Sequence, residues 1–198
     1  MEARNARSRR THATLLEAAR GIVEDQGLAA LTMGAVAERA GVTRRTVYLR
    51  FASRTQLVTA LFDHVNEQEG LAASLRPVHE APDAAAALTA WAVHVARFHP
   101  RIERFARAIQ AMREADADAA EHWRLVQADW STLCRELARR TEDEGALADG
   151  WNVETMADLL QALMSFDVQD SLLGLHGWSV DAYAAALARM VRATFLRA

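Results

Sequence analysis

The stretch TMGAVAERAGVTRRTVYLRF, residues 32–51, decides the fold class of this chain. It predicts two short helices that begin after Thr32 and Thr43, because a threonine side chain can accept a hydrogen bond from a free backbone N–H at a helix start. Gly41 lies between the two helices, where a sharp turn is needed. Two short helices joined by such a turn are typical of a helix-turn-helix. The second helix, over about residues 43–51, has a polar and basic outer face.

This second helix has the chemistry that reads DNA. Residues near the N-terminal end of a helix in the major groove can reach base edges. Arginine can bind guanine with two hydrogen bonds, threonine can bond a base or contact a thymine methyl group, and neighbouring polar side chains can bond the sugar-phosphate backbone. A solvated charged face is the ordinary alternative for an arginine-rich helix. The predicted DNA-binding residues are Thr32, Thr43, Arg44, Arg45, Thr46, Tyr48, Arg50 and Arg54.

The charges are unevenly distributed along the 198 residues. Residues 1–60 contain ten Arg and five acidic residues, a net charge of +5, whereas the rest of the chain has thirteen Arg and twenty-one acidic residues, a net charge of −8. A basic head on an acidic body indicates a polyanionic partner at one end only. Residues 4–10 contain four Arg, which form either a solubilising tail or an arm that contacts DNA.

The hydrophobic spacing predicts an all-α fold of about nine helices. Residues 70–82 are expected to be a linker, with one helix from about residue 83 to Pro100 and the next beginning at about residue 101. A further helix begins after Asn152 and reaches about residue 173. The inward positions expected in the final helix are Val180, Tyr183, Leu187, Met190 and Thr194.

Residues 10–62 resemble the DNA-binding domain of the tetracycline-repressor (TetR) family. The resemblance is carried by the string LLEAARGIVEDQGLAALTMGAVAERAGVTRRTVYLRFASRTQLVTALF, in which caps, turn and inward positions agree in register. Arg50 and Arg54 stand where His and Lys are frequent in the family, and both keep phosphate-binding chemistry.

The resemblance implies an N-terminal DNA-binding domain, here residues 1–55, and a regulatory, ligand-binding and dimerisation domain over residues 56–198. It implies a homodimer formed through the last two helices, about 152–174 and 179–196. Such a dimer would bind a palindromic operator on double-stranded DNA as a repressor and release it when a small-molecule effector binds. An effector-independent regulator or activator is an alternative, and a helical enzyme with an accessory DNA-binding head is a weaker one.

Aromatic and methionine side chains of the C-terminal region are candidates for lining an effector site, although plain core is the alternative for each one. Asp167 and Asp170 would favour a cationic ligand unless they belong to a solvated helix face. The predicted ligand-binding residues are Trp91, His94, Phe98, Phe105, Met112, Trp123, Trp130, Met164, Phe166, Asp167 and Asp170.

Other functional classes have no support in the sequence. The seven His lack metal-ligand spacing, no phosphate-binding loop or catalytic triad is recognisable, and Cys134 is expected to be a buried, inert thiol. We therefore expect no cofactor, no metal and no enzymatic activity. The N-terminus has no secretory signal and no segment is long and apolar enough for a membrane span, so a cytoplasmic location without membrane association is expected.

Overall fold

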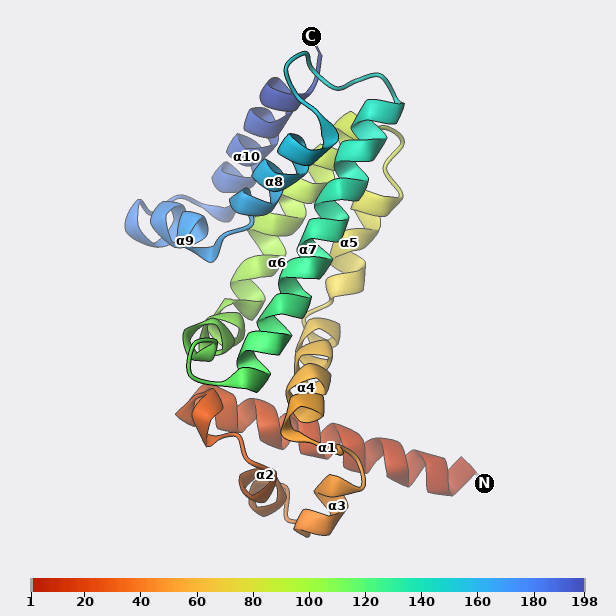
Figure 1. Ribbon diagram of the computed structural model, residues 1–198, viewed down its shortest axis with the longest axis vertical. Helices are drawn as coiled ribbons and strands as arrows, with labels where there is room; N and C mark the ends of the chain where they lie inside the picture. Colours follow the sequence, from red (N-terminus) through yellow and green to blue (C-terminus); the bar gives the residue numbers. More distant parts are fainter. Residues whose placement is uncertain (1, 198) are drawn as a thin grey trace. The chain divides into compact units, whose positions relative to one another are not determined.

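The computed structural model describes residues 2–197, and within that range every named element is helical (Figure 1). The chain folds into two compact units. Unit 1 comprises residues 1–68 and 104–125, and unit 2 comprises residues 69–103 and 126–198. The sequence-based boundary at residue 55 differs from this division, because the whole of the fourth helix packs with the N-terminal helices in unit 1.

Unit 1 contains the expected DNA-binding helices. These are α1 (Glu2–Gln26), the 3-10 turn η1 (Leu28–Ala30), α2 (Met33–Arg39), α3 (Arg44–Tyr48) and α4 (Arg54–Gln68). Its core consists of buried apolar side chains that recur at helical spacing, among them Leu15, Ala19, Ile22, Val36, Val47, Phe51, Leu57 and Leu61. The backbone of residues 2–9 is helical and continues α1, whereas the proposed roles of Arg4, Arg7 and Arg9 concern side chains outside the described ones.

Unit 2 is a bundle of longer helices. It contains α5 (Leu71–His79), most of α6 (Ala84–Met112) and of α7 (Ala117–Asp143), then α8 (Val153–Leu163), α9 (Phe166–Gln169), the π-helical turn η2 (Asp170–Leu175) and α10 (Val180–Phe195). Asn152 caps α8 as expected, with its side chain accepting from Thr155 N at 2.9 Å.

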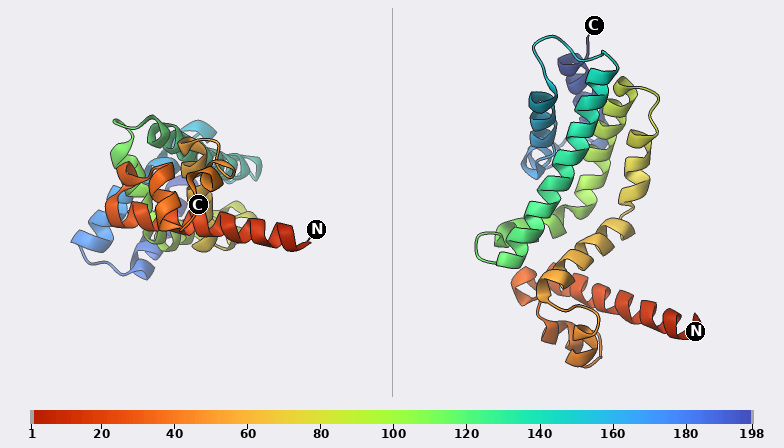
Figure 2. Two further views of the ribbon diagram at one scale, coloured as in Figure 1. Left: turned by 90° about the horizontal axis from the view of Figure 1, so that it is seen from below. Right: turned by 45° about the vertical axis from the view of Figure 1, so that its right-hand side comes forward.

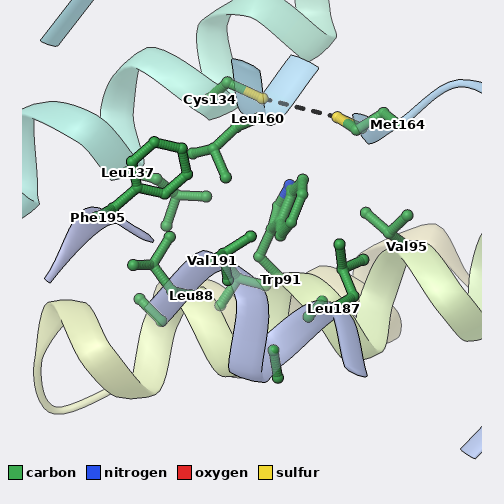
Figure 3. Close-up of a cluster of buried hydrophobic side chains, with 14 of the residues drawn as sticks. Leu88, Trp91, Val95, Cys134, Leu137, Leu160, Met164, Leu187, Val191 and Phe195 are labelled. Atoms are coloured by element: carbon green, nitrogen blue, oxygen red, sulfur yellow. Dashed lines mark hydrogen bonds between the residues drawn. The ribbon is translucent and has the colours of Figure 1, made fainter. Parts of the chain in front are cut away.

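The core of unit 2 is shown in Figure 3. Trp91 on α6 is fully buried among side chains of α6, α8 and α10, including Leu160, Leu187 and Val191. Cys134 is fully buried too, with its thiol 3.7 Å from the sulfur of Met164, and burial raises the pKa of this thiol to about 12. The expectation of a buried, unreactive cysteine is therefore confirmed.

Three segments differ from the sequence-based expectation. Residues 71–79 form helix α5 rather than a linker: Gly70 takes a left-handed conformation before it, and Val78 is buried in the unit 2 core. Helix α6 continues through Pro100, since the bundle packing outweighs the one backbone hydrogen bond that a proline removes. The helix expected over residues 152–173 ends at Leu163 and is followed by α9 and η2.

The expected inward face of α10 is correct only in part. Tyr183 and Leu187 are buried, whereas Val180 and Met190 are 38% and 44% exposed. Val180 lies in the first turn of α10, and Met190 lies beside the stripe formed by Tyr183, Leu187 and Val191. Helix α10 thus carries large apolar side chains that the core of a single chain leaves exposed.

Candidate nucleic-acid interface

Helices α2 and α3 have the two caps that the sequence predicts. Thr32 accepts a hydrogen bond from Ala35 N at 3.0 Å, and Thr43 accepts one from Thr46 N at 3.2 Å. The Thr43 and Thr46 hydroxyl groups are also 3.0 Å apart. Gly41 between the helices has φ = +66°, a conformation that glycine adopts without steric cost. The helix-turn-helix geometry therefore follows directly from residues 32–46.

The inward side of α3 determines which residues face outward. Val47 and Phe51 are buried, at 0% and 1% exposure. Since successive residues of a helix are rotated by about 100°, Arg45 and Leu49 lie opposite this buried pair. Leu49 is 74% exposed although its side chain is apolar. The outermost face of α3 thus presents one guanidinium and one isobutyl group side by side.

The remaining exposed residues flank this face. Tyr48 is 55% exposed, and Arg50 is exposed in the turn that follows α3. Arg44 is exposed as well, but its guanidinium lies against Gly34 of α2, where an added Cβ would be 2.9 Å from its Nη2. Arg44 therefore leans back along the motif, which leaves Arg45 as the arginine that projects most directly.

The segment that contains this surface is basic. Residues 39–62 contain five Arg and no acidic residue. Arg39 forms an ion pair with Asp25 at 2.7 Å, whereas Arg44, Arg45 and Arg50 have no acidic partner among the described residues. Guanidinium groups without an acidic partner, on a helix that is packed against a core, are free to bind phosphates and bases.

Arg54 has a different environment from the one that the sequence predicts. Its guanidinium is ion-paired with Asp116 and Asp118, at 2.8 and 3.0 Å, and also donates to the carbonyl oxygens of Leu31 and Leu28. These bonds occupy the donors that a DNA phosphate would need. Arg54 therefore has a structural role within unit 1, and its contact with a DNA phosphate stays a prediction.

Arg50 borders a groove of about 530 Å³ on unit 1. The groove is lined by residues of α1 and α4, and His64 on its wall is 2.7 Å from Glu17. Asp63 and Glu67 also line it, so its charge is mixed. Burial, together with the positive charges of Arg50 and His64, lowers the pKa of His12 in this groove. Because acidic and basic side chains line this groove together, its charges do not mark an anion site.

The predicted effector-site residues divide between the two units. Trp91, His94, Phe98 and Phe166 are buried in unit 2, together with Met164 and the half-buried Trp130. Phe105, Met112 and Trp123 belong to unit 1, where the Phe105 ring stacks on Phe62 with centroids 5.9 Å apart. Asp167 and Asp170 are exposed. Unit 2 therefore brings together six of the eleven candidates.

Sequence reasoning missed three polar side chains in unit 2, and it missed Leu49 at the C-terminal end of α3. Buried side chains of His99, Gln169 and Tyr183, like that of Trp91, carry polar atoms without partners among the described residues. No periodicity marks such atoms, because their significance depends on what surrounds them. Leu49 could have been found, since its position opposite Val47 and Phe51 follows from the helical repeat.

Two further findings concern the described residues only. No group of three or more His, Cys, Asp or Glu side chains is placed to hold a metal ion. None of the described helices combines the length and the apolar character that crossing a membrane requires.

Helices α2 and α3 form a helix-turn-helix, a motif that DNA-binding proteins use. Residues 15–61 match the family of bacterial regulatory proteins described as the tetR family. The regulator EthR from Mycobacterium tuberculosis is 27% identical over 135 residues, which are 67% of this chain and 62% of EthR. TtgR from Pseudomonas putida is 40% identical over 57 residues, covering 29% of this chain and 27% of TtgR.

The fold is shared with solved structures as well. NalD of Pseudomonas aeruginosa, described as the secondary repressor of the MexAB-OprM multidrug efflux pump, superposes with a TM-score of 0.72 at 21% identity, covering 97% of this chain and 98% of NalD. Over residues 15–61 the chain is thus similar to the tetR family, and its fold is similar to that of NalD. The chain aligns with less than two thirds of the length of EthR.

Proposed function

We propose that this protein is a transcriptional regulator that binds double-stranded DNA by inserting α3 into the major groove. The observation that carries this proposal is the outer face of α3, where Arg45 and Leu49 project opposite a buried pair. The surrounding segment, residues 39–62, contains no acidic residue. Arg45 would bond guanine, and Leu49 would contact a thymine methyl group. Tyr48 and Arg50, on either side, would bond the sugar-phosphate backbone and set the register.

Thr32, Thr43 and Thr46 act mainly through the helices that they organise. Two of the three hydroxyl groups cap a helix, and Thr43 and Thr46 are bonded to each other. Their exposed methyl and hydroxyl groups can still reach the DNA surface. Arg44 lies against Gly34 and would reach a phosphate on the α2 side of the groove. Base specificity is therefore assigned to Arg45 and Leu49.

We propose further that the protein works as a homodimer formed through α8 and α10. These helices lie side by side within unit 2 (Figures 1 and 2) and share its apolar core. Leu159 on α8 and Met190 on α10 are 38% and 44% exposed, and Trp178 and Val180 lead into α10 with similar exposure. Large apolar side chains gathered on two neighbouring helices are what a second copy would cover.

Repression relieved by a small molecule is the regulatory mode that we propose. NalD, which has the same fold, is described as a repressor. A ligand that binds one dimer conformation more tightly than another shifts the population toward it, and operator DNA would be released if that conformation spaces the two α3 helices wrongly. The protein would act by binding rather than catalysis, in the cytoplasm where its DNA lies.

Selection of bound sequences from random duplex DNA tests the proposed function. We expect an inverted repeat whose half-sites are separated by about one helical turn, about 10–10.5 base pairs. Guanine and thymine should occupy adjacent positions in each half-site, where Arg45 and Leu49 would lie. Recovery of sequences without any common motif, or of a single unrepeated half-site, would contradict sequence-specific binding by a dimer.

A further inference from the structure

Four buried side chains of unit 2 have a polar atom with no hydrogen-bond partner among the described residues. The atoms are Trp91 Nε1, His99 Nδ1, Gln169 Oε1 and the Tyr183 hydroxyl. The four side chains are at most 2% exposed. A buried polar group without a partner destabilises a fold, so native proteins contain few of them. Four in one bundle indicate a functional reason.

These atoms are gathered rather than scattered. Trp91, Val95 and His99 recur every four residues along one face of α6, over about 12 Å of helix. Gln169 donates through Nε2 to the Val95 carbonyl at 2.7 Å, which places it beside the same face. Tyr183 of α10 lies in the buried cluster that also contains Trp91. Figure 3 shows the indole of Trp91 extending from α6 toward Leu160 and Met164.

The surrounding walls are flat aromatic rings. The His99 ring stacks on Trp130, with centroids 5.2 Å apart and an angle of 17° between the planes. Phe166 lies 5.4 Å from His99 and 5.9 Å from Trp130, again between centroids. His94 stacks on Phe98 at 5.2 Å and 16°. These rings pack against one another, and a planar aromatic molecule is the shape that would extend such a stack.

The electrical character of this region excludes a charged ligand. The buried polar side chains of unit 2, within the described residues, are His94, His99, Thr141 and Gln169, and none is an acid or an arginine. Burial lowers the pKa of His99 to about 3 and that of His94 to about 4, so both rings are neutral at pH 7. A charge buried here would have no counter-charge, which is strongly unfavourable.

The hydrogen-bonding pattern is equally specific. Trp91 can only donate. His99 donates one ring N–H to the Met164 backbone, which leaves its Nδ1 as an acceptor. Gln169 Oε1 is an acceptor as well, and the Tyr183 hydroxyl can act in both ways. A group that both donates and accepts, such as a hydroxyl group, can pair with either kind of atom in this set.

The helix next to this region is irregular. Gln169 is the last residue of α9 and directly precedes the π-helical turn Asp170–Leu175. Single π-helical turns are rare and often lie at functional sites. The acceptor on Gln169 is thus presented by a segment whose backbone departs from regular α-helix.

We propose that the Trp91–His99 face of α6, together with Gln169 and Tyr183, binds an uncharged planar aromatic molecule that carries a hydroxyl or comparable donor–acceptor group. This molecule is the effector of the regulator, a statement that rests on the proposed function. Binding itself does not require DNA, so the two can be tested apart.

Isothermal titration calorimetry of the full chain with four naphthalene probes tests the ligand class. We expect 2-naphthol to bind about tenfold or more tightly than naphthalene, because only the hydroxyl satisfies the buried polar atoms. The anion 2-naphthoate and the cation trimethyl(2-naphthyl)ammonium should bind more weakly than 2-naphthol by a similar factor or more. Equal affinity for naphthalene and 2-naphthol, tighter binding of either ion, or no binding of 2-naphthol would overturn the proposal.

Substitutions locate the site within unit 2. Gln169→Leu and Tyr183→Phe remove one polar atom each and should reduce the preference for 2-naphthol over naphthalene several-fold. Tyr183→Phe should leave the urea midpoint unchanged or raised, since the hydroxyl has no partner to lose. Trp91→Phe should also reduce the preference for 2-naphthol over naphthalene. Its control, Trp178→Phe, changes a 42% exposed position and should leave this preference unchanged. Unchanged preference in all three site variants would contradict this location.

The two proposals fail in different ways. Operator binding in the presence and absence of 2-naphthol, followed by fluorescence anisotropy, separates them. If the protein binds its selected DNA but no probe, the ligand proposal is wrong and the DNA-binding function stands. If it binds 2-naphthol with the expected selectivity but no DNA sequence, the reverse holds.

Discussion

The guanidinium of Arg54 lies 2.8 Å from the carboxylate of Asp116, which joins the start of α4 to the start of α7 within unit 1. Asp116 also accepts hydrogen bonds from the backbone N–H groups of Asp118 and Ala119, so it caps α7. Thr55 adds a hydrogen bond to Asp118. Burial raises the pKa of Asp116, but the hydrogen bonds and charge of Arg54 outweigh that effect and leave the pKa below its usual value.

Replacing Arg54 should therefore destabilise unit 1. Arg54→Ala removes one donor from each of two carboxylates and two carbonyl oxygens. We expect the free energy of unfolding to fall by about 2 kcal/mol, less than for a fully buried pair. Urea denaturation measures the change. Arg39→Ala is the matched control: its pair with Asp25 is more exposed and should contribute only about 0–1 kcal/mol. Equal effects of both substitutions would show that the Arg54 network has no special role.

The same residue distinguishes two views of the DNA interface. If Arg54 serves the fold, the slope of log affinity against log salt should change little in Arg54→Lys. Arg50→Ala should reduce that slope by about one unit, the effect of losing one phosphate contact. DNA binding titrated with salt measures both slopes. A slope reduced as much by Arg54→Lys as by Arg50→Ala would return Arg54 to the DNA interface.

Leu49 should read thymine through its methyl group. We expect uracil at the contacted thymine positions of the selected operator to weaken binding of the native protein by about threefold to tenfold. Leu49→Ala should weaken binding to the thymine operator and abolish most of the difference between thymine and uracil. Competition with the two duplexes gives the double-mutant cycle. A uracil effect that is equally large in Leu49→Ala would assign the methyl contact to another residue.

The motif and its surroundings show what sequence can predict. The caps at Thr32, Thr43 and Asn152 and the turn at Gly41 depend on residues within four positions, so they follow from local chemistry alone. The continuity of α6 through Pro100 does not, because packing across the bundle decides it.

The candidate sites show the same contrast. Most of the predicted DNA-binding residues lie on α3 or directly beside it, where local sequence patterns suffice to place them. Arg54 is 62 residues from its partner Asp116, a distance in sequence over which no pattern signals a contact. The aromatic candidates divided between two units for the same reason.

His122 should make stability depend on pH. Neither ring nitrogen has a partner among the described residues, the ring contacts Phe62 edge-on at 4.4 Å, and burial lowers its pKa to about 4. Because His122 takes up a proton more readily in the unfolded chain than in the folded protein, the free energy of unfolding falls as the pH drops from about 6.5 toward 4. His122→Leu should remove this pH dependence. The free energy of unfolding of the variant, relative to that of the native protein, should therefore rise by up to about 2 kcal/mol between pH 7 and pH 5. Urea denaturation at both pH values provides the comparison, and a relative free energy that does not rise contradicts the assignment.

The exposed apolar face of α8 and α10 should hold two copies together. Met190→Glu and Leu159→Glu place a charge where the partner would pack, and we expect either substitution to raise the dimer dissociation constant at least about tenfold. Analytical ultracentrifugation measures the change. Arg135→Glu on the exposed side of α7 is the control and should leave the dimer intact. A dimer that survives both α8 and α10 substitutions must use another face.

The claim that α3 reads DNA bases is best tested with the variant Arg45→Ala. Fluorescence anisotropy gives its affinity for the selected operator and for the same duplex with each half-site guanine replaced. We expect the native protein to bind the selected operator more tightly than the altered duplex, with a difference in binding free energy of about 1–3 kcal/mol. Arg45→Ala should lose most of this difference, and the control Arg135→Ala should keep it. Undiminished discrimination in Arg45→Ala would show that α3 does not read the bases as its outer face indicates.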